Sequence, residues 1–215
     1  VADALKRAHK RLGSRNQNVA LALPAAMVIT KKIIVPSGQR DDELELLVEA
    51  EANQYIPFAL DEVNLDFQIV GPAPNNPEES EVLIAASRKE KVEDRVAVAE
   101  AAGLKPRVMD IESYAMQQAF ELISPTLPAS GRDQNIALVD IGAHVTHFYV
   151  LRNNQFLFAR DQAFGGNQLT HDVQRAFNLT PDEAESAKKS QGLPENYDID
   201  VLQPFMETLA LEVTR

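Results

Sequence analysis

The hydrophobic and polar positions of the 215-residue chain follow two periods, that of a strand and that of a helix, in successive stretches. Apolar side chains occupy every second position from Val63 to Ile69, which predicts a strand with one buried and one solvent-facing side. Residues 41–56 carry apolar side chains at helical spacing after an acidic first turn, which predicts a helix. Residues 82–86 are apolar throughout, as in the central strand of a sheet.

The first half of the chain contains further helix and strand signals. A capping box at Ser87–Glu90 predicts the start of a helix that ends near Gly103. Three prolines and two asparagines between Gly71 and Ser80 predict a loop. The other helices predicted here are Ala2–Leu12 and Glu112–Leu122, and the other strands are Val19–Leu23, Met27–Val35 and Arg107–Ile111. The order from Leu44 to Ile111 predicts a compact α+β unit.

A proline- and glycine-containing stretch, Ser124–Asp133, predicts a linker between two parts of the chain. Beyond it, three consecutive antiparallel strands are predicted at Ile136–Ile141, Val145–Leu151 and Phe156–Ala163. The helices predicted after them are one capped by Asn167, one opened by Thr180 with Pro181 and Glu183, and a last one at Leu202–Arg215. The chain is therefore predicted to be α/β, with α+β subdomains.

Composition and charge narrow the classes of function. The absence of cysteine excludes disulfides, thiolate zinc sites and cysteine nucleophiles, and favours a cytoplasmic location. A net charge of −11 opposes binding to nucleic acid or to an anionic bilayer, so the expected partners are proteins or small ligands. The acidity is concentrated between Asp41 and Asp94, a range that contains fifteen acidic residues and three basic ones.

Hydropathy and the two chain ends add two expectations. No apolar run approaches the roughly 20 residues of a membrane helix, so direct membrane insertion is not expected. The sequence begins with Val1 inside a predicted helix and runs off its end inside another. We therefore expect this chain to be a piece of a longer protein.

The candidate site with the most chemical content is the bend between the first two strands of the second half. Gly142 and Ala143 at this bend would let backbone N–H groups approach an anion, and Asp140 at the strand end could hold a hydrated Mg²⁺ ion. Thr146 is the last residue of this candidate segment, 140–146. A plain β-turn in which the aspartate binds its own amides fits the same local pattern.

Two other constellations are less promising. His144 and His147 have a metal-ligand spacing on a helix, but in a strand side chains three positions apart point to opposite faces. Asp110 and Glu112 share a face at strand spacing, but acid–base chemistry of the glycosidase type needs one raised pKa in a cleft, and a solvated strand end is the expected interpretation. A basic cluster near the start of the chain is expected to be an ordinary helix face. Its members are Lys6, Arg7, Lys10, Arg11 and Arg15.

Several segments together resemble the family of the type IV pilus assembly protein PilM, across nearly the whole chain. The combination of Gln54-Tyr55-Ile56-Pro57-Phe58 with the later Phe164-Gly165-Gly166 is the specific part of the resemblance. The other matching segments are 49–53, 63–67, 102–104, 110–112, 169–170 and 183–185. The bend at Gly142 looks like the second phosphate loop of the actin-like ATPase superfamily, to which PilM belongs.

The resemblance implies an actin-like ATPase fold with an FtsA-like subdomain 1C. On that basis the chain would divide into part of subdomain 1A (1–34), subdomain 1C (35–106), the end of 1A with a linker (107–130), the start of 2A (131–164) and the start of 2B (165–215). The acidic block would then belong to subdomain 1C.

The resemblance also implies a function. Members of the family are cytoplasmic scaffolds of the type IV pilus inner-membrane platform, peripheral to the membrane, that bind the cytoplasmic N-terminal peptide of PilN in a groove between 1A and 1C. They thereby couple the envelope complex to the motor ATPases, which are expected partners together with a second copy of PilM. Tyr55, Ile56 and Phe58 are the residues that we expect near the peptide, with core packing as the equally open alternative.

The nucleotide site is implied only in part. Asp140, Gly142, Ala143 and Thr146 would contact the phosphates of ATP with Mg²⁺, and Gly165 and Gly166 would form a turn near the nucleotide. The family's first phosphate loop and its adenosine motif are absent from this sequence, and His144 and Val145 stand where small hydroxyl residues are usual. ATP binding is therefore expected of the full-length protein and not of this piece.

Catalysis is not expected of this chain, and the full-length protein would have at most a weak ATPase activity. Three alternatives share the architecture: the cytoplasmic part of a GspL-like type II secretion protein, an FtsA-like cell-division protein, and a fragment of an actin-fold kinase. The α+β block from Asp41 to Ile111 argues against a sugar kinase and against a chaperone-type ATPase.

Overall fold

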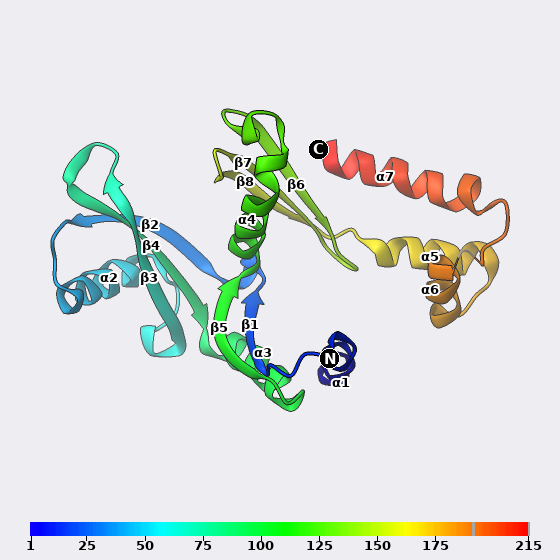
Figure 1. Ribbon diagram of the computed structural model, residues 1–215, viewed down its shortest axis with the longest axis horizontal. Helices are drawn as coiled ribbons and strands as arrows, with labels where there is room; N and C mark the ends of the chain where they lie inside the picture. Colours follow the sequence, from blue (N-terminus) through cyan, green and yellow to red (C-terminus); the bar gives the residue numbers. More distant parts are fainter. Residues whose placement is uncertain (191, 215) are drawn as a thin grey trace. The chain divides into compact units, whose positions relative to one another are not determined.

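A computed structural model describes residues 1–190 and 192–214 and divides the chain into two compact units, Val1–Ala119 and Phe120–Arg215 (Figure 1). The division falls within a helix, Glu112–Ile123, before the predicted linker Ser124–Asp133, which stays a prediction. Both units contain helices and sheets, which agrees with the predicted α/β class. The subdomain limits inferred from the resemblance stay predictions.

The first unit contains an antiparallel sheet with strand order β2-β4-β3. Helix α2 packs on one face of it, and Val48 of the helix and Val82 of the central strand are fully buried there. Because apolar residues alternate along each strand, the other face of the sheet is free of this core. The bounds are β2 Ile29–Pro36, α2 Asp41–Tyr55, β3 Val63–Ala73 and β4 Asn76–Arg88.

The rest of the first unit is built on a parallel pair of strands. Strand β1 pairs with β5, and α3 contacts both strands. Helix α1 ends at Gly13, whose φ of 68° suits glycine at a helix C-terminus. Helix α4 follows β5 directly and continues across the boundary between the units. The bounds are α1 Ala2–Leu12, β1 Asn18–Leu23, α3 Lys89–Ala101, β5 Lys105–Ile111 and α4 Glu112–Ile123.

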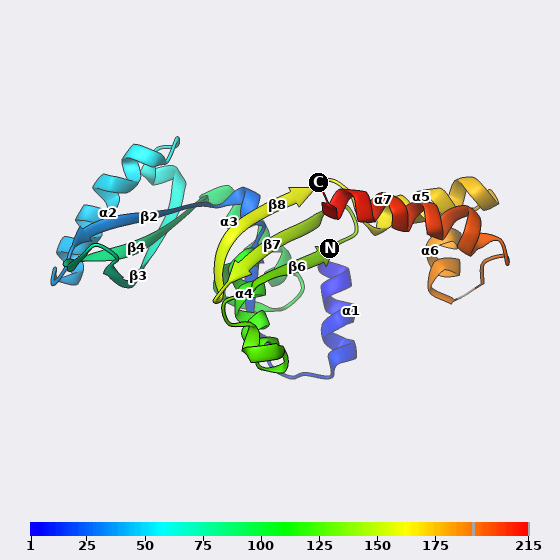
Figure 2. The ribbon, with the colours of Figure 1, turned by 90° about the horizontal axis from the view of Figure 1, so that it is seen from above.

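The second unit contains an antiparallel sheet with order β6-β7-β8, followed by three α-helices. Figures 1 and 2 show α5 and α6 beyond one end of the sheet and α7 running back toward it, where Arg160 of β8 donates to the backbone oxygen of Glu212 at 2.7 Å. Val173 and Ala184 are fully buried between the helices. The bounds are β6 Asn135–Ile141, β7 Thr146–Arg152, β8 Gln155–Gln162, α5 Gly166–Phe177, α6 Pro181–Ser190 and α7 Gln203–Thr214.

Short helical turns complete the described chain. Four of them are 3₁₀ turns, and a π-helical turn at Asp198–Leu202 precedes α7, where the sequence predicted one regular helix from Leu202. The 3₁₀ turns are η1 Ala25–Met27, η2 Leu60–Glu62, η3 Ser124–Thr126 and η4 Pro128–Gly131. Arg215, which was included in the predicted last helix, lies outside the described residues. None of the helices in the described ranges is long and apolar enough to span a membrane.

Three local predictions were wrong. The predicted loop of residues 71–80 is mostly a hairpin, in which only Pro74 and Asn75 turn. Pro72 lies in the edge strand β3, where proline is tolerated, and Pro77 of β4 has no partner in the register of either neighbouring strand. Ser87 does not cap α3; it pairs with Asn64 in the sheet, and its hydroxyl donates to the oxygen of Met27 at 2.9 Å. Asn167 does not cap α5, since that helix already begins at Gly166.

Candidate functional site

The bend between β6 and β7 is a tight turn of residues 142–145. The N–H of Gly142 donates to the oxygen of Val145 at 3.0 Å and closes the turn. A Cβ atom on Gly142 would lie 2.7 Å from that oxygen, so this position requires glycine for reasons of space. Asp140 and Ile141 precede the turn and pair across the strands with His147 and Thr146.

The start of α5 closes against this turn. The N–H groups of Gly166 and Asn167 donate to the oxygens of Gly142 and Ala143 at 2.9 and 2.8 Å. A Cβ atom on Gly165 would lie 2.5 Å from the oxygen of Gly142, so the close approach also requires glycine at 165. The structure thus brings together the two segments that the resemblance associates with a nucleotide.

The turn uses its carbonyl groups for this contact and leaves amide donors available. In the described part of the chain, the N–H groups of Ala143, His144 and Val145 have no hydrogen-bond acceptor. The hydroxyl of Thr146 is fully buried and donates to the oxygen of Phe164 at 2.7 Å, so it fixes the approach to α5. Three successive free N–H groups at a turn, with a carboxylate at the strand end, form a suitable cradle for an anion and its counterion.

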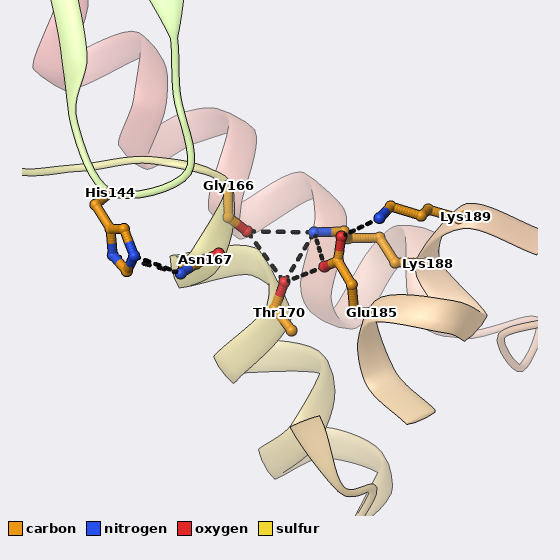
Figure 3. A network of polar contacts seen from close by, with 7 residues as sticks. All are labelled: His144, Gly166, Asn167, Thr170, Glu185, Lys188 and Lys189. Carbon is orange, nitrogen blue, oxygen red and sulfur yellow. Dashed lines mark hydrogen bonds and ion pairs between the residues drawn. The ribbon is translucent and has the colours of Figure 1, made fainter. Parts of the chain in front are cut away.

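A polar network links α6 to the start of α5 (Figure 3). Lys188 donates to the Thr170 hydroxyl at 2.8 Å, and that hydroxyl donates to Glu185 at 2.9 Å. Glu185 also forms ion pairs with Lys188 at 2.7 Å and Lys189 at 2.8 Å. Hydrogen bonds from Lys188, Lys189 and Thr170 lower the pKa of Glu185 to about 2. Lys188 also reaches the oxygen of Gly166 at 3.5 Å, next to the turn.

This network was not predicted from the sequence. Its signal was present, because Glu185 precedes Lys188 and Lys189 by three and four positions, the spacing of ion pairs on a helix. The partner on the other helix, Thr170, could not be identified from the spacing, since it depends on how α5 and α6 pack.

The two histidines near the turn have separate surroundings. His147 Nδ1 lies 2.7 Å from Asp161 Oδ1 on the neighbouring strand. The ring of His144 lies beside the amide of Asn167, with contacts of 3.2 and 3.4 Å from its Nδ2 atom to the two ring nitrogens (Figure 3). Within residues 1–190 and 192–214, no three His, Asp or Glu side chains are arranged to hold a metal ion.

The first unit contains a groove on the sheet face opposite α2. It consists of two adjoining hollows of about 380 and 420 Å³, which share the lining residues Asp66, Ala85, Met109, Asp110 and Ile111. Strands β3 and β4 line one side, and β5 with the start of α4 lines the other. Apolar side chains, amides and the two carboxylates are therefore available to a ligand.

The predicted partner residues lie elsewhere in the unit. Ile56 is buried in the core between α2 and the sheet, which agrees with the alternative of core packing. Tyr55 is half exposed under Lys31, whose Nζ is 4.8 Å from the ring centre. Phe58 stacks with Arg88 and lines a separate hollow of about 360 Å³. None of the three lines the groove, and their contact with a partner stays a prediction.

Two comparisons with known proteins match the whole chain or nearly all of it. The family model of the type IV pilus assembly protein PilM matches residues 1–215. A solved structure described as the PilM-PilN type IV pilus biogenesis complex is 31% identical over 98% of this chain, with a TM-score of 0.68. This chain covers 61% of the length of that one, which is less than two thirds.

Two other solved structures are more distant. The ethanolamine utilization protein EutJ from Carboxydothermus hydrogenoformans is 24% identical, with a TM-score of 0.43 over 56% of this chain and 41% of its own. MreB 5 of Spiroplasma citri bound to AMPPNP is 14% identical, with a TM-score of 0.36 over 88% of this chain and 41% of its own.

Proposed function

The chain belongs to the family of the type IV pilus assembly protein PilM, and from this premise we propose that it acts as a scaffold of the type IV pilus machine that binds PilN. The observation that supports this most directly is its 31% identity, over 98% of the chain, to a protein whose structure is that of a PilM-PilN complex. We propose recruitment and conformational coupling as its mode of action, without a need for catalytic turnover.

The partner segment that we propose is the cytoplasmic N-terminal peptide of PilN, bound in the groove between β3, β4, β5 and α4. The groove is open and lined by apolar side chains such as Leu83, Met109 and Ile111, which a short peptide can cover. PilN would hold the scaffold at the cytoplasmic side of the inner membrane. The motor ATPases and a second copy of the protein remain the further partners that we propose.

We also propose that the turn of residues 142–145 binds the phosphates of ATP with Mg²⁺. The N–H groups of Ala143, His144 and Val145 would donate to phosphate oxygens, and Asp140 would hold the hydrated ion. The buried hydroxyl of Thr146 would maintain the position of α5 against the turn. The negative charge of the nucleotide phosphates would attract these three N–H groups.

Peptide binding tests the central proposal. A fluorescent peptide with the N-terminal sequence of PilN from the same organism is titrated with the protein as encoded in its genome, and anisotropy is measured. We expect saturable binding, while a scrambled peptide of the same composition binds at least tenfold more weakly. Equal binding of both peptides, or none, contradicts the proposal.

A calorimetric titration tests the nucleotide proposal. Asp140→Asn removes the charge that would hold the ion, so it should weaken MgATP binding about tenfold and leave the affinity for ATP in EDTA unchanged. Asp133→Asn is a control, because Asp133 precedes β6 at the end opposite the turn, where its side chain accepts a hydrogen bond from Asn153. Equal effects of the two variants on MgATP contradict the assignment of Asp140.

A further inference from the structure

The groove of the first unit carries two negative charges and no positive one among its lining residues. Asp66 and Asp110 line both hollows. Two basic side chains on the surrounding elements are already paired, Lys32 with Glu81 at 3.2 Å and Arg95 with Glu112 at 4.0 Å. Among the described residues, no basic side chain forms an ion pair with Asp66 or Asp110.

Each of the two carboxylates instead accepts a hydrogen bond from the next N–H along its own strand. Phe67 N donates to Asp66 Oδ1 at 2.8 Å, and Ile111 N donates to Asp110 Oδ1 at 2.7 Å. One bond from a neutral amide uses a small part of the acceptor capacity of an ionised carboxylate. Both groups can therefore accept further, stronger hydrogen bonds from a cation without losing an existing ion pair.

The strands that carry these residues are edge strands. Among the residues that the structure describes, β3 pairs with β4 on one side only, and β5 pairs with β1 on one side only. Consecutive residues of each strand line the groove, 64–68 of β3 and 109–111 of β5. A groove lined by consecutive residues of two strands accommodates a peptide in extended conformation, whose side chains alternate between the groove and its rim.

We propose that Asp66 and Asp110 are specificity residues that select a partner peptide by a Lys or Arg side chain placed against both carboxylates. Apolar side chains on either side of that residue would contact Leu83, Met109 and Ile111. This inference rests on the proposed function, because the groove is the site assigned there to the PilN peptide. Beyond that function, the inference names a basic side chain as the recognised part of the peptide and Asp66 and Asp110 as the residues that recognise it.

Local recognition has to be separated from the general attraction of the acidic unit for any basic peptide. Long-range attraction acts chiefly on the association rate and depends on total charge, whereas a contact depends on position. Removal of two charges in the groove should therefore weaken binding more than removal of two charges elsewhere on the same unit. Glu45 and Glu49 on α2 provide that comparison, since α2 packs on the opposite face of the sheet.

The experiment compares three forms of the complete protein: the unaltered protein, Asp66→Asn/Asp110→Asn, and the control Glu45→Gln/Glu49→Gln. Asparagine keeps an oxygen that can accept the N–H bonds of Phe67 and Ile111. Each form is titrated with the PilN N-terminal peptide and with a copy in which every Lys and Arg is replaced by Gln, both acetylated at the amino terminus. Anisotropy is measured at physiological salt.

We expect the unaltered protein and the α2 control to prefer the basic peptide about tenfold, and the groove variant to lose the preference. If the unaltered protein binds both peptides equally, the inference is overturned while the proposed function stands. Equal losses in the groove variant and the α2 control also overturn it, because charge alone would then suffice. Failure of the unaltered protein to bind the native peptide overturns the proposed function instead.

Discussion

Two glycines determine whether the turn of residues 142–145 and the start of α5 fit together. At Gly165 a methyl group would collide with the backbone oxygen of Gly142 and the carbonyl of Ala143, and backbone atoms cannot move aside as a side chain can. At Gly166 the same addition finds its nearest neighbour at 3.8 Å, an ordinary contact. Neighbouring glycines thus differ in what they tolerate, although the sequence presents them as a pair.

We therefore expect Gly165→Ala to lower the free energy of unfolding of the second unit by about 1–3 kcal/mol, the usual cost of forced close contact. It should also speed hydrogen exchange at the amides of Gly166 and Asn167, whose bonds to the turn would lengthen. Gly166→Ala is the matched control and should change stability by less than about 1 kcal/mol. Equal exchange rates in the two variants would contradict this interpretation of the contact.

The charge network on α6 gives a prediction about pH. The pKa of Glu185 is lowered to about 2 in the folded chain, while in the unfolded chain it has the ordinary value near 4.5. The stabilisation by ionised Glu185 is therefore fully present above pH 4.5 and is lost as the pH falls toward 2. Because the Glu185 side chain is 39% exposed and screened by water, we expect its ionised form to stabilise the fold by about 1 kcal/mol at neutral pH.

A carbon-13 NMR titration of the Glu185 carboxyl group measures this directly. In the unaltered chain the midpoint should lie well below the ordinary 4.5, and Lys188→Met should raise it, because Lys188 is the largest cause of the shift. Arg175→Met serves as a control, since Arg175 is paired with Asp172 of α5 instead. A midpoint at the ordinary value in the unaltered chain would disprove the role of the network.

For single residues, the sequence predicted which positions matter better than which other residues they contact. Gly142 was identified because a small residue at a bend lets backbone N–H groups approach an anion, and that role stays a prediction. The structure shows another need for glycine there, since a Cβ atom would lie 2.7 Å from the oxygen of Val145. That Gly142 and Gly165 face each other follows from packing across more than twenty residues, which no local spacing encodes. Asp66 was distinguished only as one of the polar residues of an alternating strand.

At the scale of elements, the order of helices and strands followed from hydrophobic period, and the errors arose where tertiary pairing overrode local signals. The predicted capping box at Ser87–Glu90 failed because β4 continues to Arg88 in register with Val63 of β3. The cap predicted at Thr180 was correct: Glu183 Oε2 accepts from the N–H of Thr180 at 2.9 Å, and Pro181 opens the helix.

Thr180→Ala should therefore destabilise α6 by about 1 kcal/mol, the usual value of a lost side-chain cap. The hydrogen bonds from Thr180 lower the pKa of Glu183, so the same variant should raise that pKa toward its ordinary value. Hydrogen exchange of α6 amides and an NMR titration of Glu183 measure the two effects. Thr180→Ser keeps the hydroxyl and should preserve both; a Ser variant that behaves like the Ala variant would contradict the capping role.

At the scale of the whole molecule, the family was predicted correctly from the sequence, as the match over residues 1–215 shows, and the fold agrees with that of the PilM-PilN structure at a TM-score of 0.68. Most of the net charge of −11 lies in the first unit, because that unit contains the acidic block from Asp41 to Asp94. The same unit contains the groove. The position of the groove could not be predicted, because it is formed by strands that are distant in sequence.

The proposed peptide groove and the proposed phosphate turn lie in different units. A scaffold that works by conformational coupling requires the two sites to be linked, and linkage is reciprocal: the factor by which the peptide changes ATP affinity equals the factor by which ATP changes peptide affinity. A coupling of about 1 kcal/mol, the low end of typical values, corresponds to about a fivefold change.

We expect saturating PilN peptide to shift the Kd of MgATP for the complete protein at least fivefold, measured by calorimetry, and MgATP to shift the Kd of the peptide by the same factor, measured by anisotropy. Asp66→Asn/Asp110→Asn should weaken peptide binding, so a peptide concentration that does not saturate this variant should no longer shift the Kd of MgATP. Without peptide, the variant should bind MgATP with unchanged affinity. If both ligands bind and neither alters the affinity for the other, the protein is a passive scaffold, and coupling through the nucleotide is excluded.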